Sequence, residues 1–153
     1  MSSDGPQLQV LVVEDDLGDL ALIESSFAEH SVLSRLHHAA DGAEALAFLR
    51  REEPFTAAPR PDLILLDLNM PRMDGRQLLN EIKSDDRLKS IPTIVFTTSS
   101  SITDIVASYA ARANAYITKP MDLHDYDRVV IEMRNFYGHT ASLPRRSSDE
   151  PAR

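Results

Sequence analysis

The chain contains no cysteine, which excludes a disulfide framework and any metal site built from thiolates. No apolar run approaches the ~18 residues that a membrane-spanning helix needs. The first residues also lack the charged start and the apolar stretch of a secretory signal. We therefore expect a soluble, cytoplasmic protein that makes no contact with a membrane.

Positive charge is also scarce, because 16 Lys and Arg residues stand against 24 Asp and Glu residues, for a net charge of −8. A protein that binds nucleic acid needs clustered basic side chains to neutralise the phosphates. We therefore expect no direct binding to nucleic acid. The length of 153 residues suits one α/β domain with a single core.

Short apolar segments alternate five times with segments of helical periodicity. The predicted strands are 10–13 (continued from Leu8), 34–40, 62–67, 92–97 and 115–118. The predicted helices are 19–29, one around 45–49 that follows a turn or cap at Asp41-Gly42, 78–82, 102–109 and a last one capped by Asp122. The inner face of the last helix is predicted to carry Leu123, Tyr126, Val130, Met133 and Tyr137. This alternation indicates an α/β fold in three layers, with a doubly wound parallel sheet between two layers of helices.

The composition changes at both ends of the chain. Residues 1–6 are predicted to form an N-terminal tail and residues 7–138 a single domain. From 139 onward the sequence is rich in Ser, Pro, Arg and Glu without periodicity. We therefore expect residues 139–153 to form a mobile C-terminal tail.

Polar side chains follow four of the five predicted strands. They are Glu14, Asp15 and Asp16 after the first, Asp67 and Asn69 after the third, Thr97 and Thr98 after the fourth, and Lys119 after the fifth. In parallel sheets, ligands bind at the carboxyl ends of the strands. Clustered carboxylates need a compensating charge, and their oxygens suit Mg²⁺ or Mn²⁺. With the added positive charge of a lysine, the set suits phosphoryl chemistry at a carboxylate nucleophile.

Four motifs, in this order, resemble the receiver domain of two-component response regulators. They are VVEDD at 12–16, LDLNMPRMDG at 66–75, VFT at 95–97 and YITKP at 116–120. The resemblance covers roughly residues 7–138 and implies a flavodoxin-like fold with five helices and the strand order 2-1-3-4-5. It also implies a signalling module that accepts a phosphoryl group and is not an enzyme.

The resemblance assigns a role to each matched position. It makes Asp67 the phosphoacceptor, and Thr97 and Lys119 the residues that contact the phosphoryl group. The implied ligands of Mg²⁺, with Mn²⁺ as an alternative, are Glu14, Asp15, Asp67 and the backbone carbonyl of Asn69. Thr97 and Tyr116 form the implied conformational switch. The resemblance further implies a cis bond between Lys119 and Pro120, and Asn114 stands where a left-handed helix cap is expected.

Several segments resemble the stand-alone receivers associated with bacterial phytochrome-type histidine kinases. They are the run of Thr and Ser at 97–101, the proline-bearing loop near 53–61 and the stretch NAYITKP at 114–120. The expected partner is therefore a sensor histidine kinase of this type. We expect no output domain after the last predicted helix. That helix carries Val129, Ile131 and Phe136 outside its core stripe, which favours a homodimer through the fourth helix, fifth strand and fifth helix. Isolated surface apolar residues are the alternative interpretation.

Three other functions fit parts of the pattern. A phosphatase of the haloacid-dehalogenase type uses an aspartyl nucleophile but places a second Asp two residues later, where this chain has Asn69. A flavodoxin-like cofactor binder wants a phosphate loop after the first strand, where this chain is acidic. A receiver that acts as an unphosphorylated scaffold stays open as the third alternative.

Overall fold

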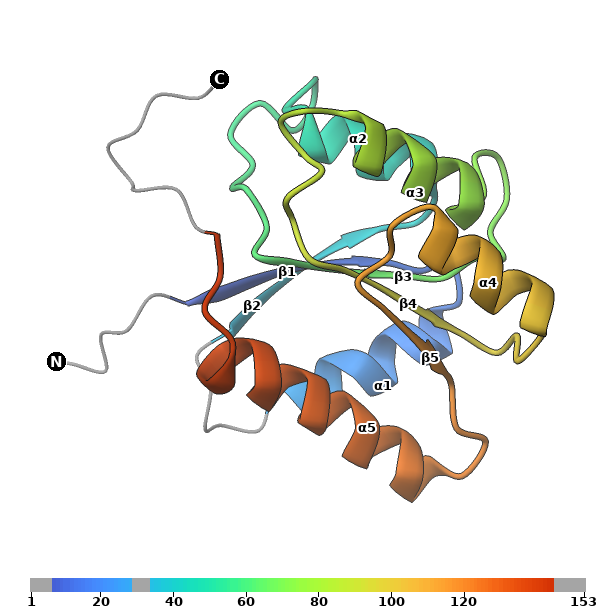
Figure 1. The fold of residues 1–153 in the computed structure, drawn as a ribbon. Coiled ribbons are helices and arrows are strands. Elements are labelled where there is room, and N and C mark those ends of the chain that lie inside the picture. The colour runs from blue at the N-terminus through green and yellow to red at the C-terminus, as the bar shows by residue number, and fades with distance from the viewer. Residues whose placement is uncertain (1–6, 29–33, 145–153) are drawn as a thin grey trace, which may run out of the picture.

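The computed structural model describes residues 7–28 and 34–144, which form one five-stranded parallel sheet in the order β2-β1-β3-β4-β5 (Figure 1). The strands are β1 (Leu8–Val13), β2 (Ser34–Ala39), β3 (Leu63–Leu66), β4 (Thr93–Thr97) and β5 (Ala115–Thr118). The predicted fold class and strand order are confirmed.

Five helices cover the two faces of the sheet. They are α1 (Leu17–Ala28), α2 (Gly42–Leu49), α3 (Gly75–Ser84), α4 (Ile102–Ala110) and α5 (Leu123–Asn135). Figure 1 shows α1 and α5 on one face and α2, α3 and α4 on the other. Among the described residues, no helix has both the length and the apolar character required to cross a membrane.

The three central strands β1, β3 and β4 are buried on both faces, so their side chains alternate between two cores. Leu11 and Val13 of β1 face the core under α2 and α3, whereas Val10 and Val12 face the core over α1 and α5. All residues of β3 are buried as well. This burial explains why the central strands read as continuous apolar runs and not as alternating ones.

Aspartate or serine caps the start of four helices. Their side-chain oxygens accept backbone N–H groups from the first turn, and the caps are Asp41, Asp74, Ser101 and Asp122. The predicted caps at Asp41 and Asp122 are therefore confirmed. The helix α1 begins two residues earlier than predicted, and the Asp16 carboxylate accepts from the N–H groups of Gly18 and Asp19.

Three local predictions are wrong. The left-handed residue after α4 is Arg112, with φ 75°, because the helix ends at Ala110; Asn114 instead uses its side chain for hydrogen bonding. Glu53–Pro54 is the only cis peptide bond among the described residues, so Lys119–Pro120 is trans. Leu123 is 66% exposed, because the first residue of α5 points away from the sheet.

The ordered chain continues past the predicted end of the domain. Residues Phe136–Thr140 form a π-helical turn, η1, and Leu143 packs against the α1/α5 core. The predicted N-terminal tail at 1–6 and the final part of the C-terminal tail, 145–153, lie outside the described residues.

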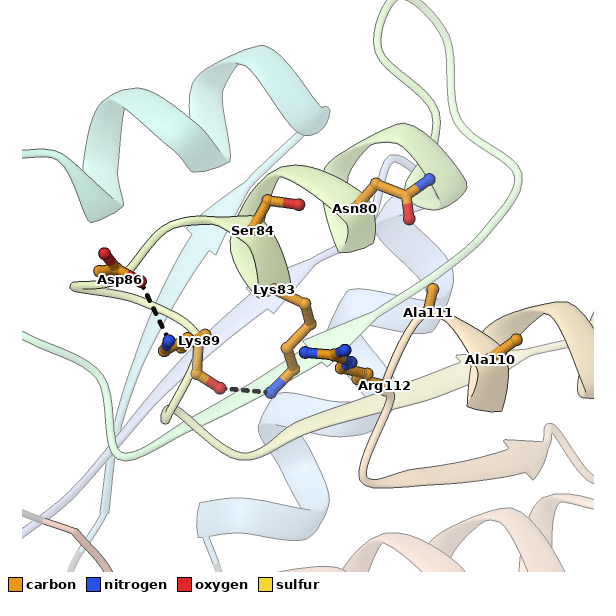
Figure 2. Close-up of a pocket in the computed structure, with 8 residues that line it drawn as sticks. All are labelled: Asn80, Lys83, Ser84, Asp86, Lys89, Ala110, Ala111 and Arg112. Atoms are coloured by element: carbon orange, nitrogen blue, oxygen red, sulfur yellow. Dashed lines mark hydrogen bonds and ion pairs between the residues drawn. The ribbon is translucent and has the colours of Figure 1, made fainter.

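Lys83 is a buried lysine on α3 whose ammonium contacts the loop between α3 and β4 and the residue before β5. Together with the ends of α3 and α4, its side chain lines a cavity of about 380 Å³. Figure 2 shows the side chain extending from α3 toward the backbone of Lys89. Its Nζ donates to the carbonyls of Lys89 at 2.9 Å and Ile91 at 3.0 Å, and to Asn114 Oδ1 at 3.1 Å. These acceptors are neutral, and burial lowers the pKa of Lys83 to about 8.

This lowered pKa predicts a specific dependence of stability on pH. Between pH 8 and 10 the unfolded chain retains the Lys83 proton while the folded protein releases it, so the contribution of this group to stability increases with pH. The unfolding free energy of wild type relative to Lys83→Met should rise by about 2 kcal/mol across that range. Urea unfolding at several pH values measures this difference in unfolding free energy. The exposed Lys89→Met variant is the control, and its difference from wild type should stay constant with pH. A constant difference between wild type and Lys83→Met would contradict the prediction.

Candidate functional site

Backbone hydrogen bonds hold the predicted acidic residues at one edge of the sheet. The N–H of Asp67 donates to the Val13 carbonyl at 3.1 Å, and that of Glu14 donates to the Ala39 carbonyl at 3.0 Å. The carboxylates of Glu14, Asp15 and Asp67 each place one oxygen within 4.8 Å of the others. Glu14 and Asp67 are buried, and Asp15 is exposed. We call these three residues the carboxylate cluster.

The ammonium of Lys119 lies against this cluster. Its Nζ contacts Glu14 Oε1 at 2.7 Å, Asp19 Oδ2 at 3.0 Å and Asp67 Oδ2 at 3.2 Å. The backbone of Lys119 continues the pairing of β5 with β4, since its N–H donates to the Thr97 carbonyl at 2.7 Å. The side chain is only 3% exposed, so solvent screens these contacts weakly.

The charges of this site are incompletely balanced. Burial raises the pKa of Glu14 to about 7, although Lys119 opposes this rise, and the neighbouring charge of Asp67 adds to it. Burial alone would lower the pKa of Lys119, but its hydrogen bond and charge contacts with Glu14, and the charge of Asp67, raise it above its ordinary value. One lysine therefore leaves surplus negative charge on buried oxygens. A hard divalent cation with oxygen ligands fits this donor set.

The loop after β3 folds back on the acceptor aspartate. The N–H of Asn69 donates to Asp67 Oδ1 at 3.3 Å, and the N–H of Gly75 donates to the Leu68 carbonyl at 3.0 Å. Asn69 itself is exposed beside the carboxylate cluster. Its position suits the predicted contribution of a backbone carbonyl to a metal, which stays a prediction.

The same loop is tied to the start of α2. Arg72, which has a positive φ of 61°, forms an ion pair with the buried carboxylate of Asp41. The N–H of Gly42 donates to the Met73 carbonyl at 3.0 Å. These contacts place the β3–α3 loop against a rigid helix end, close to the acceptor.

Thr97 and Tyr116 both contact Ser99. Thr97 is fully buried at the end of β4, and its Oγ1 accepts from the Ser99 N–H at 3.5 Å. The half-buried Tyr116 donates its hydroxyl proton to the Ser99 carbonyl at 2.8 Å. Ser99 Oγ in turn donates to Asp104, which also accepts from Arg76, and these hydrogen bonds lower the pKa of Asp104. The predicted switch residues therefore meet through one loop residue.

Two residues at the site were absent from the sequence prediction. Asp19 was assigned only to a helix, and Tyr126 only to the core, yet Asp19 contacts Lys119 and accepts a hydrogen bond from the Tyr126 hydroxyl at 3.0 Å. Asp19 lies in the first turn of α1, directly after the acidic run at 14–16, and this proximity along the chain is the one sequence signal for it. No sequence signal indicates the hydroxyl contact of Tyr126.

Comparison with known proteins gives consistent matches over nearly the whole chain. The family model described as the response regulator receiver domain matches residues 10–130. The response regulator Rcp1 of Synechocystis sp. is 40% identical over 139 residues, which cover 91% of this chain and 95% of Rcp1.

Two solved structures have the same fold at similar identity. The phosphorylated cyanobacterial phytochrome response regulator RcpA matches with a TM-score of 0.89 and 43% identity, and the Mn²⁺-bound form of Rcp1 with 0.87 and 39%. Each match covers 92% of this chain and 100% of the solved one. The chain therefore belongs to the response regulator receiver domain family of two-component signalling proteins.

Proposed function

We propose that this chain is a response regulator that accepts a phosphoryl group from a sensor histidine kinase onto Asp67, in a Mg²⁺-dependent reaction. The observation that carries the proposal is the position of the Asp67 carboxylate. It belongs to the carboxylate cluster and also lies 3.2 Å from the buried ammonium of Lys119. A nucleophile flanked by a cation site and a fixed positive charge is the arrangement that phosphoryl transfer requires.

The proposed chemistry uses residues of this chain in defined roles. A carboxylate oxygen of Asp67 attacks the phosphorus of a phosphohistidine, an O–P bond forms, and the N–P bond breaks with its electron pair left on the histidine nitrogen. Lys119 donates an N–H to a phosphoryl oxygen. A divalent cation held by Glu14, Asp15, Asp67 and the Asn69 carbonyl would offset the charge of the transferring group. The Mn²⁺-bound structure of Rcp1 supports a divalent cation in this family.

The proposed response passes through Thr97 and Tyr116. Thr97 turns its hydroxyl toward the phosphoryl group, and the loop at Ser99, which bonds to both residues, changes with it. Such a change biases an equilibrium between two states of the loop and of the adjoining α4. In this role the protein is a phosphoryl acceptor and not an enzyme, and Asn69 supplies no acid that a phosphatase would need two residues after the nucleophile.

The proposed output surface is α4-β5-α5, used by a homodimer or a protein partner. Ile102, Val106 and Tyr109 are 73%, 61% and 49% exposed and lie one turn apart along α4. Val129 packs partly against the α1/α5 core, so it adds less to this surface than predicted, but Leu123 and Phe136 at the two ends of α5 are 66% and 49% exposed. We further propose a cytoplasmic location, no contact with nucleic acid, and a phytochrome-type kinase as partner. The description of RcpA as a phytochrome response regulator supports that partner.

Intact mass spectrometry after incubation with acetyl phosphate and Mg²⁺ tests the proposal. Wild type should gain about 80 Da, the mass of one phosphoryl group. Asp67→Asn should gain nothing, because an amide oxygen is a much weaker nucleophile than a carboxylate. Exposed Asp86→Asn is the matched control and should gain the same mass as wild type.

Three outcomes would count against parts of the proposal. A mass gain that persists in Asp67→Asn would place the acceptor elsewhere. No gain in wild type, together with no binding of beryllofluoride, would favour the unphosphorylated scaffold. Sedimentation of the phosphorylated sample tests the dimer, and a monomer with and without the phosphoryl group would contradict self-association.

A further inference from the structure

Lys119 has one carboxylate partner that lies outside the carboxylate cluster. An ammonium has three N–H donors, and Glu14, Asp19 and Asp67 occupy all three at 2.7, 3.0 and 3.2 Å. Glu14 and Asp67 also belong to the set that can hold a cation, whereas Asp19 does not. Of the three carboxylates that contact Lys119, only Asp19 lies outside the potential cation site.

Asp19 is itself held from two sides. Its backbone N–H donates to Asp16 Oδ1 at 3.1 Å in the first turn of α1, and its Oδ1 accepts from the Tyr126 hydroxyl of α5 at 3.0 Å. Tyr126 is 4% exposed, and burial raises its pKa above the ordinary value, so the hydroxyl keeps its proton and remains a donor. The Tyr126 ring packs edge-on against Phe96 at 5.3 Å between centroids.

Phe96 contacts Lys119 as well as Tyr126. The Nζ of Lys119 lies 5.8 Å from the centroid of its ring. A continuous path of hydrogen bonds and ion pairs thus runs from Tyr126 through Asp19 and Lys119 to Asp67. It links α5 and α1 to the phosphoacceptor at the end of β3.

The three carboxylates differ in how well they retain Lys119 when the site is occupied. A cation at the carboxylate cluster shares the charge of Glu14 and Asp67, which weakens their attraction for the ammonium and adds repulsion. A buried ammonium is costly unless its partners remain charged and in contact. Asp19 keeps its full charge for Lys119 because it shares nothing with the cation. Asp19 is therefore the partner that can hold the lysine in place during the reaction.

We propose that Asp19, oriented by the Tyr126 hydroxyl, is a positioning residue that keeps the Lys119 ammonium beside Asp67 when the carboxylate cluster holds a cation. This inference rests on the proposed function. During transfer, the N–H that Lys119 directs at Asp67 moves to a phosphoryl oxygen, and the N–H directed at Asp19 stays in place. Asp19 touches neither the phosphoryl group nor the cation and acts through Lys119 alone.

The test is the time course of phosphoryl uptake from acetyl phosphate at saturating Mg²⁺, followed by intact mass. Asp19→Asn should slow uptake about tenfold, the effect of losing one hydrogen bond between charged groups. In a Lys119→Met background the same substitution should change the rate by less than about twofold, because its target is gone. Tyr126→Phe should slow uptake less than Asp19→Asn, and the double variant should match Asp19→Asn.

The control and a second readout separate this role from a general effect of charge or folding. Glu24→Gln changes the charge of α1 equally at an exposed position and should leave the rate unchanged. The NMR signal of the Lys119 ammonium should persist in wild type with Mg²⁺ and should be lost by faster exchange in Asp19→Asn and weakened in Tyr126→Phe.

The outcomes distinguish a failure of the positioning role of Asp19 from a failure of the proposed function. An unchanged rate in Asp19→Asn, or an equal loss with and without Lys119, would overturn the positioning role. If wild type takes up no phosphoryl group and binds no beryllofluoride, the proposed function fails. The NMR signal of the Lys119 ammonium, recorded with and without Mg²⁺, then tests the positioning role independently of phosphoryl uptake. If this signal survives in Asp19→Asn with Mg²⁺, the positioning role is refuted.

Discussion

Replacing Gly75 by alanine should destabilise the protein by about 3 kcal/mol and disturb the acceptor loop. A Cβ at this position would lie 2.1 Å from the Asp67 carbonyl oxygen and 2.6 Å from the Leu68 Cα. These neighbours are backbone atoms, so no flexible side chain can move aside. Helix propensity alone would favour alanine by about 1 kcal/mol, so the sign of the change separates the two effects.

Gly18→Ala is the matched control for this prediction. Gly18 lies in the first turn of α1, and its added Cβ would meet only the Asp16 Oδ1, at 3.1 Å. Its stability should therefore stay within about 1 kcal/mol of wild type. Urea unfolding measures both variants, and intact mass after acetyl phosphate treatment reports on Asp67. If Gly75→Ala is as stable as wild type, the prediction is wrong, and the backbone at Asp67 and Leu68 can move away from α3 to make room for the added Cβ.

Lys119→Met should have the second large effect, in opposite directions for stability and for cation binding. Without a cation, the variant leaves Glu14, Asp19 and Asp67 without their shared partner, and the unfolding free energy should fall by about 3 kcal/mol. The affinity for Mg²⁺ should rise by about tenfold or more, because a positive charge 2.7 Å from Glu14 and 3.2 Å from Asp67 has been removed.

Unfolding with and without Mg²⁺, and Mg²⁺ titrations followed by tyrosine fluorescence, measure these two changes. The chain has four tyrosines and no tryptophan, which makes tyrosine the available probe. Exposed Lys89→Met, whose partner is Asp86, should change stability by no more than about 0.5 kcal/mol. Equal Mg²⁺ affinities of wild type and Lys119→Met would contradict the prediction, because they would mean that the Lys119 charge does not oppose cation binding at the carboxylate cluster.

The convergence of Glu14, Asp67, Thr97 and Lys119 follows from the sequence alone. Each residue ends a short apolar segment, and the alternation with helices makes those segments parallel strands. The carboxyl ends of parallel strands with right-handed crossovers lie at the same edge of a sheet, so residues there must meet. The motifs around these residues carried the family resemblance, and the fold, the strand order and the family are confirmed.

The tertiary structure decided the contacts between residues that share no local pattern. Tyr126 and Asp19 are 107 positions apart, and their contact depends on how α5 packs against α1. Asn114 was predicted to be a helix cap, but its side chain is used by Lys83 and by the backbone of β4.

The physical reason is the range of the interactions. Periodicity, caps and strand ends are set by neighbours along the chain, which the sequence displays directly. Side-chain contacts between helices depend on the packing of both faces of the sheet, and each is one of many geometries that the same pattern permits. The sequence therefore determined which residues meet at the sheet edge, and only the packing of α1 and α5 determined that Asp19 and Tyr126 hold Lys119 there.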